Sequence, residues 1–240
     1  MKKILIIHGY PQELSENHPV NVFFTKKGYK IFAPKLFSSE LDFNLKNSIQ
    51  IIKETLGKDK PDLILGFSLG GLILPHIAKD YPKARLIFAS TGIGFYPNIV
   101  YRIGITIAAT PLIYPGLFLL KLIPYSIFYF FYRILNPAGK DDDKEWYEID
   151  KELNYKSITS IPAKKQMQIL RMIREIDNTN ILKQIQNKSI VLGGENDKLM
   201  PISGSQNIHK LLKHSILVKV KKSHFSVIDI ESLEKAYVLL

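Results

Sequence analysis

Ser68 stands in a setting that can make a serine nucleophilic. The segment 66–70 reads Gly-Phe-Ser-Leu-Gly, after the apolar run 63–65 and before a stretch that can begin a helix. The flanking glycines, Gly66 and Gly70, allow a tight turn from strand to helix, which lifts the serine hydroxyl above the sheet edge. This is the form of a nucleophile elbow. A glycine-rich loop with a solvated serine can carry the same pattern by chance, so the segment alone leaves both interpretations open.

A nucleophilic serine needs a base, and the base needs a group that orients it. Asp197 closely follows the apolar run 189–192, and His224 closely follows the run 215–220. If both runs are parallel strands, their carboxyl ends lie at the same sheet edge as Ser68. Taken singly, the aspartate is also typical of a turn and the histidine of a loop. Together, in the order Ser, Asp, His and each just after a strand, they predict a catalytic triad.

The elements that would position these residues alternate between strand and helix patterns. Short apolar runs separated by segments with helical spacing predict an α/β fold, a mostly parallel sheet with helices on both faces. The predicted strands are residues 3–7, 29–33, 62–66, 84–89, 189–192 and 215–220, and the predicted helices are 19–27, 45–56, 69–80, 163–176, 204–213 and a last one from about 230.

A long insertion of different character separates the fourth and fifth predicted strands. Residues 103–120 carry no charge, and residues 122–132 are rich in Phe and Tyr. We therefore expect an α/β core formed by residues 1–96 and 178–240, and an inserted, hydrophobic, mainly helical cap at residues 97–177.

The uncharged stretch approaches the length that spans a bilayer. Pro111 and Pro115 interrupt it, and no second span of comparable length returns the chain to the sheet. A cap that packs over the core or faces the substrate is the leading interpretation. A patch embedded in a membrane surface is the second, and a transmembrane helix is the third.

Composition and charge exclude several classes of site. The 240 residues suit one domain with a full core, and 46% are hydrophobic, as in globular proteins. The chain has no cysteine, which excludes disulfides, thiolate catalysis and cysteine-type zinc sites. No metal-ligand spacing or phosphate-binding glycine loop is present, so we expect no metal and no cofactor.

The basic charge bears on partners and location. The formal net charge is +11, but the lysines are scattered, with no block of five or six like charges. This pattern points weakly to an anionic membrane surface and gives no specific nucleic-acid partner. The apolar run 4–7 is too short for a secretory signal and reads as a buried first strand. We expect a cytoplasmic protein, either free or peripheral at a membrane surface.

Four segments make the chain similar to the α/β-hydrolase family, over nearly all its length. His8-Gly9-Tyr10 resembles the family's oxyanion loop, and residues 66–71 resemble its nucleophile elbow. Residues 193–201, Gly-Gly-Glu-Asn-Asp-Lys-Leu-Met-Pro, resemble the segment that carries its acid, and residues 223–225, Ser-His-Phe, resemble its histidine loop. The insertion stands where the family usually has its cap. The extra N-terminal strands of larger members are not expected, because the first strand here leads directly into the oxyanion loop.

The resemblance implies a role for each matched residue. Ser68 is the nucleophile, His224 takes its proton and later activates water, and Asp197 orients and stabilises the imidazole. The backbone N–H groups of Tyr10 and Leu69 form the oxyanion hole. His8 is expected to brace the oxyanion loop rather than take part in the chemistry.

The function indicated is that of a serine hydrolase, lipase-like or esterase-like, acting on a carboxylic ester or thioester through an acyl-enzyme. A serine at the elbow argues against dehalogenases and epoxide hydrolases, which the resemblance associates with aspartate there. The apolar cap suggests an apolar acyl group, so the expected partner is a small ester or lipid-like molecule. Peripheral membrane contact through the cap is an alternative that the sequence leaves open. C–C bond hydrolysis, acyl transfer, or a non-catalytic protein that binds an apolar ligand or a membrane remain alternatives. The acyl-chain length and oligomeric state are left open.

Overall fold

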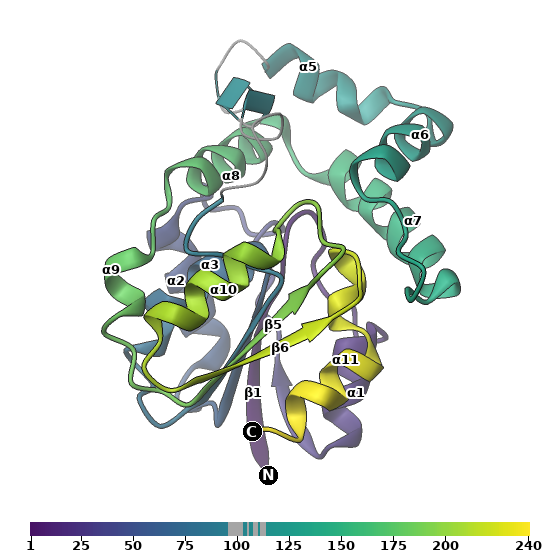
Figure 1. Cartoon of the computed structure of the whole chain (residues 1–240). Coiled ribbons are helices and arrows are strands. Elements are labelled where there is room, and N and C mark those ends of the chain that lie inside the picture. Colours follow the sequence, from purple (N-terminus) through teal and green to yellow (C-terminus); the bar gives the residue numbers. More distant parts are fainter. Residues whose placement is uncertain (96–102, 105, 108–109, 111–113) are drawn as a thin grey trace.

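A computed structural model describes residues 1–240 except 96–102, 105, 108–109 and 111–113 (Figure 1). Six parallel strands form one sheet in the order β2-β1-β3-β4-β5-β6. The predicted strands are confirmed to within two residues, and the α/β class with them. The strands are β1 (Lys2–Ile7), β2 (Tyr29–Phe32), β3 (Leu63–Phe67), β4 (Arg85–Ala89), β5 (Ser189–Gly194) and β6 (Ser215–Val220).

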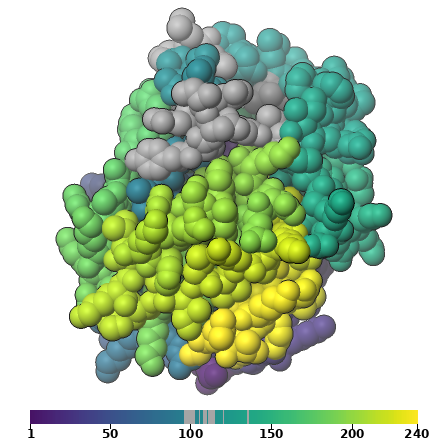
Figure 2. Space-filling view, viewed as in Figure 1, coloured from purple at the N-terminus to yellow at the C-terminus, as the bar shows by residue number. Residues whose placement is uncertain are grey.

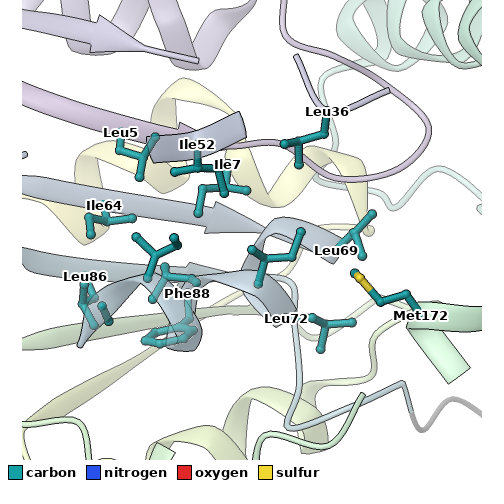
Figure 3. Packing of buried hydrophobic residues seen from close by; sticks show 14 of the residues in the cluster. Leu5, Ile7, Leu36, Ile52, Ile64, Leu69, Leu72, Leu86, Phe88 and Met172 are labelled. Carbon is teal, nitrogen blue, oxygen red and sulfur yellow. The ribbon is translucent and has the colours of Figure 1, made fainter. Parts of the chain in front are cut away.

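The central strands are apolar because both faces of the sheet are covered. In β1, Ile4 and Ile6 point into one buried cluster, and Leu5 and Ile7 point into the other. This alternation follows from the two-residue period of a strand. Figure 3 shows part of the second cluster, in which Leu5 and Ile7 pack with side chains of β3 and β4.

Helices cover both faces, as the sequence predicts. Phe24 of α1 and Leu233 of α11 are fully buried against the face that carries Ile4. Ile52 of α2, Ile73 of α3 and Ile208 of α10 are fully buried against the other face. These helices are α1 (Pro19–Lys26), α2 (Leu45–Leu56), α3 (Leu69–Ala78), α10 (Ile202–Leu211) and α11 (Ile230–Tyr237), with the short helix η3 (Phe225–Ile228) before the last.

Residues 90–188, called the β4–β5 segment below, connect the fourth and fifth strands. Its helices α5, α6 and α7 lie beyond the sheet, at the end of the molecule opposite both termini (Figures 1 and 2). The division into a core and a cap at residues 97–177 stays a prediction. The described helices of the segment are α5 (Tyr114–Leu119), η2 (Leu120–Leu122), α6 (Tyr125–Leu135), α7 (Lys144–Ser160), α8 (Ala163–Glu175) and α9 (Thr179–Leu182).

The uncharged stretch 103–120 is only partly described. Pro111 lies outside the described residues, whereas Pro115 is the second residue of α5, where proline fits a helix start. In the described part of the chain, no helix combines the length and hydropathy that crossing a bilayer requires.

Candidate active site

Ser68 occupies the turn between β3 and α3. Its backbone has φ +51° and ψ −115°, a region that non-glycine residues rarely adopt and that is typical of functional sites. Two hydrogen bonds hold this turn: the Ser68 N–H donates to the carbonyl oxygen of Ala89 at 2.9 Å, and the Thr91 hydroxyl donates to the carbonyl oxygen of Ser68 at 2.9 Å. The last residue of β4 and the loop after it therefore support the strained backbone of Ser68.

The two elbow glycines are required by close backbone contacts. A Cβ atom on Gly70 would lie 1.9 Å from the carbonyl oxygen of Ile7, and one on Gly66 would lie 2.6 Å from the carbonyl oxygen of Gly70. Both contacts are with backbone atoms, which cannot move aside as a flexible side chain can. The pattern in the sequence thus has a steric cause: β1, the turn and α3 pass too close for side chains.

The structure brings together the three side chains singled out from the sequence. The distance from His224 Nε2 to Ser68 Oγ is 3.0 Å, and that from His224 Nδ1 to Asp197 Oδ2 is 2.7 Å. Asp197 and His224 are buried. The second carboxylate oxygen of Asp197 accepts the backbone N–H groups of Leu199 and Met200 at 2.9 and 2.8 Å, which fixes the carboxylate. This arrangement can move a proton from the serine to the imidazole and stabilise the resulting positive charge.

β5 runs two residues beyond its predicted end at 192. Gly193 and Gly194 pair with Lys219 and Val220 and continue the strand toward Asp197. A Cβ on Gly194 would lie 2.5 Å from the carbonyl oxygen of Lys222. Glycine weakens a strand signal in a sequence, but here it permits the close approach that places the aspartate beside the histidine loop.

Asp142 supports the histidine loop from a distant part of the chain. Its carboxylate accepts the backbone N–H of Ser223 at 3.0 Å and that of Gly139 at 2.7 Å, and its side chain is buried. Asp142 is thus buried although it belongs to the charged run 140–145, a pattern that is typical of a solvated loop or of a helix start. Nothing in the sequence separates it from its acidic neighbours, because its partner is 81 positions away.

Tyr10 and Leu69, the predicted oxyanion-hole residues, line the same cavity as Ser68. Leu69 is the first residue of α3, so its N–H has no acceptor within the helix. The Tyr10 side chain is held by a hydrogen bond from its hydroxyl to Gln166 Oε1 at 3.2 Å, and burial raises the pKa of this phenol above its usual range. The His8 side chain is buried, and its Nε2 accepts the N–H of Leu36 at 3.3 Å.

An apolar cavity of about 570 Å³ adjoins Ser68 and His224. Its walls include residues of α3 and of α6, α7 and α8 of the β4–β5 segment: Leu72, Phe128, Ile158, Leu170 and Ile173. Met200, in the loop between β5 and α10, also lines it. Part of the segment expected to form a cap thus faces the serine. The cavity can hold an apolar group next to the hydroxyl.

A buried polar network beside this cavity was not found from the sequence. Asp150 of α7 accepts hydrogen bonds from Gln12 Nε2 at 2.6 Å, from the Tyr132 hydroxyl at 2.7 Å and from Asn154 Nδ2 at 2.8 Å. All four side chains are buried. The network joins the loop after β1 to α6 and α7. Polar residues scattered along a helix look alike in a sequence, so no signal marks Asp150.

Two opposing effects set the protonation of this carboxyl group. Burial raises the pKa of Asp150 to about 6, while the hydrogen bonds from Tyr132 and Gln12 and the charge of His224 act to lower it. The Tyr132 ring also lies 6.2 Å from the ring of Phe225, next to His224. The network therefore borders on the histidine loop.

Comparisons with known proteins bear on the fold. No protein-family model matches the sequence, and a search of curated proteins found no match. Solved structures match over the whole chain: an esterase from Exiguobacterium antarcticum has a TM-score of 0.77 at 16% identity, covering 100% of this chain and 90% of that one. The chain has the α/β-hydrolase fold.

Two further α/β-hydrolase structures show how varied the similar proteins are. A thermophilic esterase from Thermogutta terrifontis has a TM-score of 0.72 at 14% identity, with 100% of this chain and 88% of that chain covered. A meta-cleavage product hydrolase has a TM-score of 0.62 at 16% identity, with 100% and 89% covered. At these identities the likeness concerns the fold, and the chemistry must be argued from the site.

Proposed function

We propose that this α/β-hydrolase-fold protein is a serine hydrolase that cleaves a carboxylic ester or thioester with an apolar acyl group. The observation that carries the proposal is the chain of hydrogen bonds from Ser68 through His224 to Asp197, at the wall of an apolar cavity. The esterases among the similar structures agree with it.

The reaction would proceed in two halves. As Ser68 Oγ attacks the carbonyl carbon, His224 Nε2 takes the hydroxyl proton, and the backbone N–H groups of Tyr10 and Leu69 stabilise the developing oxyanion. His224 then gives the proton to the departing alcohol or thiol, which leaves an acyl-enzyme on Ser68. In the second half His224 takes a proton from water, the hydroxide attacks the acyl carbonyl, and the proton returns to Ser68 as the acid leaves.

The cavity argues for the acyl group. The described residues that line it are mostly apolar, and besides Ser68 and His224 the polar ones are Tyr10, Tyr132, Asn136 and Asn154. The Tyr10 and Tyr132 hydroxyls already donate hydrogen bonds to Gln166 and Asp150. The volume of about 570 Å³ is in the range of small-molecule sites. Each methylene that moves from water into such a cavity contributes about 0.8 kcal/mol. A substrate with a medium or long acyl chain is therefore favoured over an acetate.

The same triad can serve C–C bond hydrolysis or acyl transfer. C–C bond hydrolysis is the second candidate function, because one of the similar structures is a meta-cleavage product hydrolase. A non-catalytic protein that binds an apolar ligand is the remaining alternative. Whether Ser68 reacts distinguishes all of these enzymes from the non-catalytic protein.

A fluorophosphonate probe tests the proposal directly. The wild-type protein and Ser226→Ala, which changes another buried serine, should both be labelled, whereas Ser68→Ala should not. A wild-type protein that folds and remains unlabelled excludes the hydrolase mechanism. A series of p-nitrophenyl esters then tests the substrate: kcat/KM should rise from acetate to octanoate, and a preference for acetate counts against the apolar acyl group.

A further inference from the structure

The outward face of α6 is apolar. Ile127, Phe130, Phe131 and Ile134 are each 47 to 61% exposed, and their spacing of three and four residues puts them on one side of the helix. The other side of α6 packs inward, where Phe128 lies 5.3 Å from the ring of Tyr155. In a helix of a globular protein an apolar face of this kind normally packs against the core. On α6 the inward side packs in this way, and the outward apolar side is left exposed.

The exposed apolar surface continues beyond α6. Phe118 and Leu119 of α5 and Leu122 of η2 are also more than half exposed. We call these residues, together with the four on α6, the apolar end surface. It belongs to the end of the molecule opposite both termini (Figure 1). Large exposed apolar patches on otherwise globular proteins mark interaction sites.

The charge around this surface is of one sign. Lys121 and Arg133 are exposed within it, and the sequence has no Asp or Glu between Asp80 and Asp141. On the adjacent helix α7, two of the acidic residues are paired with lysines: Glu148 with Lys151, and Glu152 with Lys156. An apolar face with basic residues and no acidic ones fits the headgroup region of an anionic bilayer. A two-fold contact with a second copy would instead bring like charges together.

The apolar end surface connects with the cavity at Ser68. Phe131 belongs to this surface and also lines the cavity, and Ile123, next to Leu122, lines it as well. The apolar end surface and the cavity that holds Ser68 therefore share the Phe131 side chain.

We propose that the apolar end surface docks on anionic lipid bilayers and that the apolar substrate enters the cavity from the bilayer. The docking stands on the exposed residues and their charge alone, whereas the entry of substrate rests on the proposed function.

Flotation with vesicles tests the docking. The full chain should float with vesicles that contain phosphatidylglycerol and much less with pure phosphatidylcholine. The combined variant Leu122→Ser, Phe130→Ser, Ile134→Ser should bind about a hundredfold more weakly or worse, since three large apolar side chains no longer enter the bilayer. Removing the charges with Lys121→Gln and Arg133→Gln should weaken binding about fivefold each.

The matched control changes three similarly exposed apolar residues on the core: Ile216→Ser, Ile230→Ser and Val238→Ser. It should float like the wild type, and circular dichroism should show that all variants fold. The docking would be overturned if the folded wild type did not float, or if the control variant lost as much vesicle binding as the combined variant. It would also be overturned if the protein formed a dimer that the Leu122, Phe130 and Ile134 substitutions dissociate. Fluorophosphonate labelling without vesicles separates the two proposals: a protein that floats but is not labelled keeps the docking and loses the hydrolase, and one that is labelled but does not float does the reverse.

Discussion

Gln12 and Asp150 stand 138 positions apart and are joined by a buried hydrogen bond of 2.6 Å. Gln12 lies two residues after Tyr10, whose N–H we assign to the oxyanion hole. A side chain of the β4–β5 segment thus holds the loop that carries one of the proposed catalytic donors. The Asp150 carboxylate also accepts a hydrogen bond from the Tyr132 hydroxyl of α6. The loop after β1, α6 and α7 are therefore all joined at this one carboxylate.

Stability should depend on pH through Asp150. Burial raises its pKa from 3.8 to about 6, so the folded protein binds this proton more tightly than the unfolded chain does. The resulting stabilisation is complete below about pH 4 and is lost as the pH rises through about 6; at 1.36 kcal/mol per pKa unit it amounts to about 3 kcal/mol. Asp150→Asn cannot titrate and should lack this loss. Urea unfolding of both proteins from pH 4 to 7 measures the difference. If the free energy of unfolding changed with pH in the same way for both proteins, the prediction would be contradicted.

Gln12→Leu should lower kcat about tenfold while leaving KM for a p-nitrophenyl octanoate nearly unchanged. The substitution removes the hydrogen bond that positions the oxyanion loop, and a misplaced donor affects the transition state more than the bound ester. Gln50→Leu, on an exposed position of α2, is the control and should leave both constants as they are. An equal rise in KM in place of a fall in kcat would show that Gln12 shapes the cavity instead.

Asp197→Asn should lower kcat about ten-thousandfold with little effect on folding, because an asparagine no longer holds the imidazole in the tautomer that accepts the Ser68 proton. Glu195→Gln, an exposed neighbour, serves as the control. Steady-state kinetics and circular dichroism provide the two readouts. A loss of less than tenfold in a folded variant would mean that another group orients His224.

Gly70→Ala should prevent folding or cost more than about 4 kcal/mol, because its methyl group would collide with the carbonyl oxygen of Ile7. At Gly104 a Cβ atom meets nothing within 4 Å, so Gly104→Ala should change the free energy of unfolding by no more than about 1 kcal/mol. Denaturant titration compares the two. Similar free energies of unfolding for both variants would refute the steric account of the elbow.

Much of the candidate site was predictable because its parts obey local rules. Ser68 lies in a turn with a recognisable glycine pattern, and Asp197 and His224 each follow a strand. Parallel strands point their carboxyl ends to the same sheet edge, so residues 27 and 156 positions apart could be placed together without coordinates.

The support around the site could not be predicted in this way. Asp142 and Asp150 lie in a stretch of ordinary polar residues, and each takes its role from a partner at least 81 positions away, Ser223 for one and Gln12 for the other. The extra length of β5 could not be predicted from the sequence for a related reason. Its two glycines weaken the strand pattern in the sequence. The reason for glycine at position 194 is the close approach of the Lys222 backbone, which only the tertiary structure shows.

The sequence by itself determined the α/β order of strands and helices and the three residues of the proposed triad, because the hydrophobic period and the turn chemistry are local properties. Only the tertiary structure decided which acidic side chains are buried, that Phe131 lines the cavity, and that the apolar face of α6 points outward. These depend on which distant segments pack together, and the same apolar spacing describes a helix whether its face is covered or exposed.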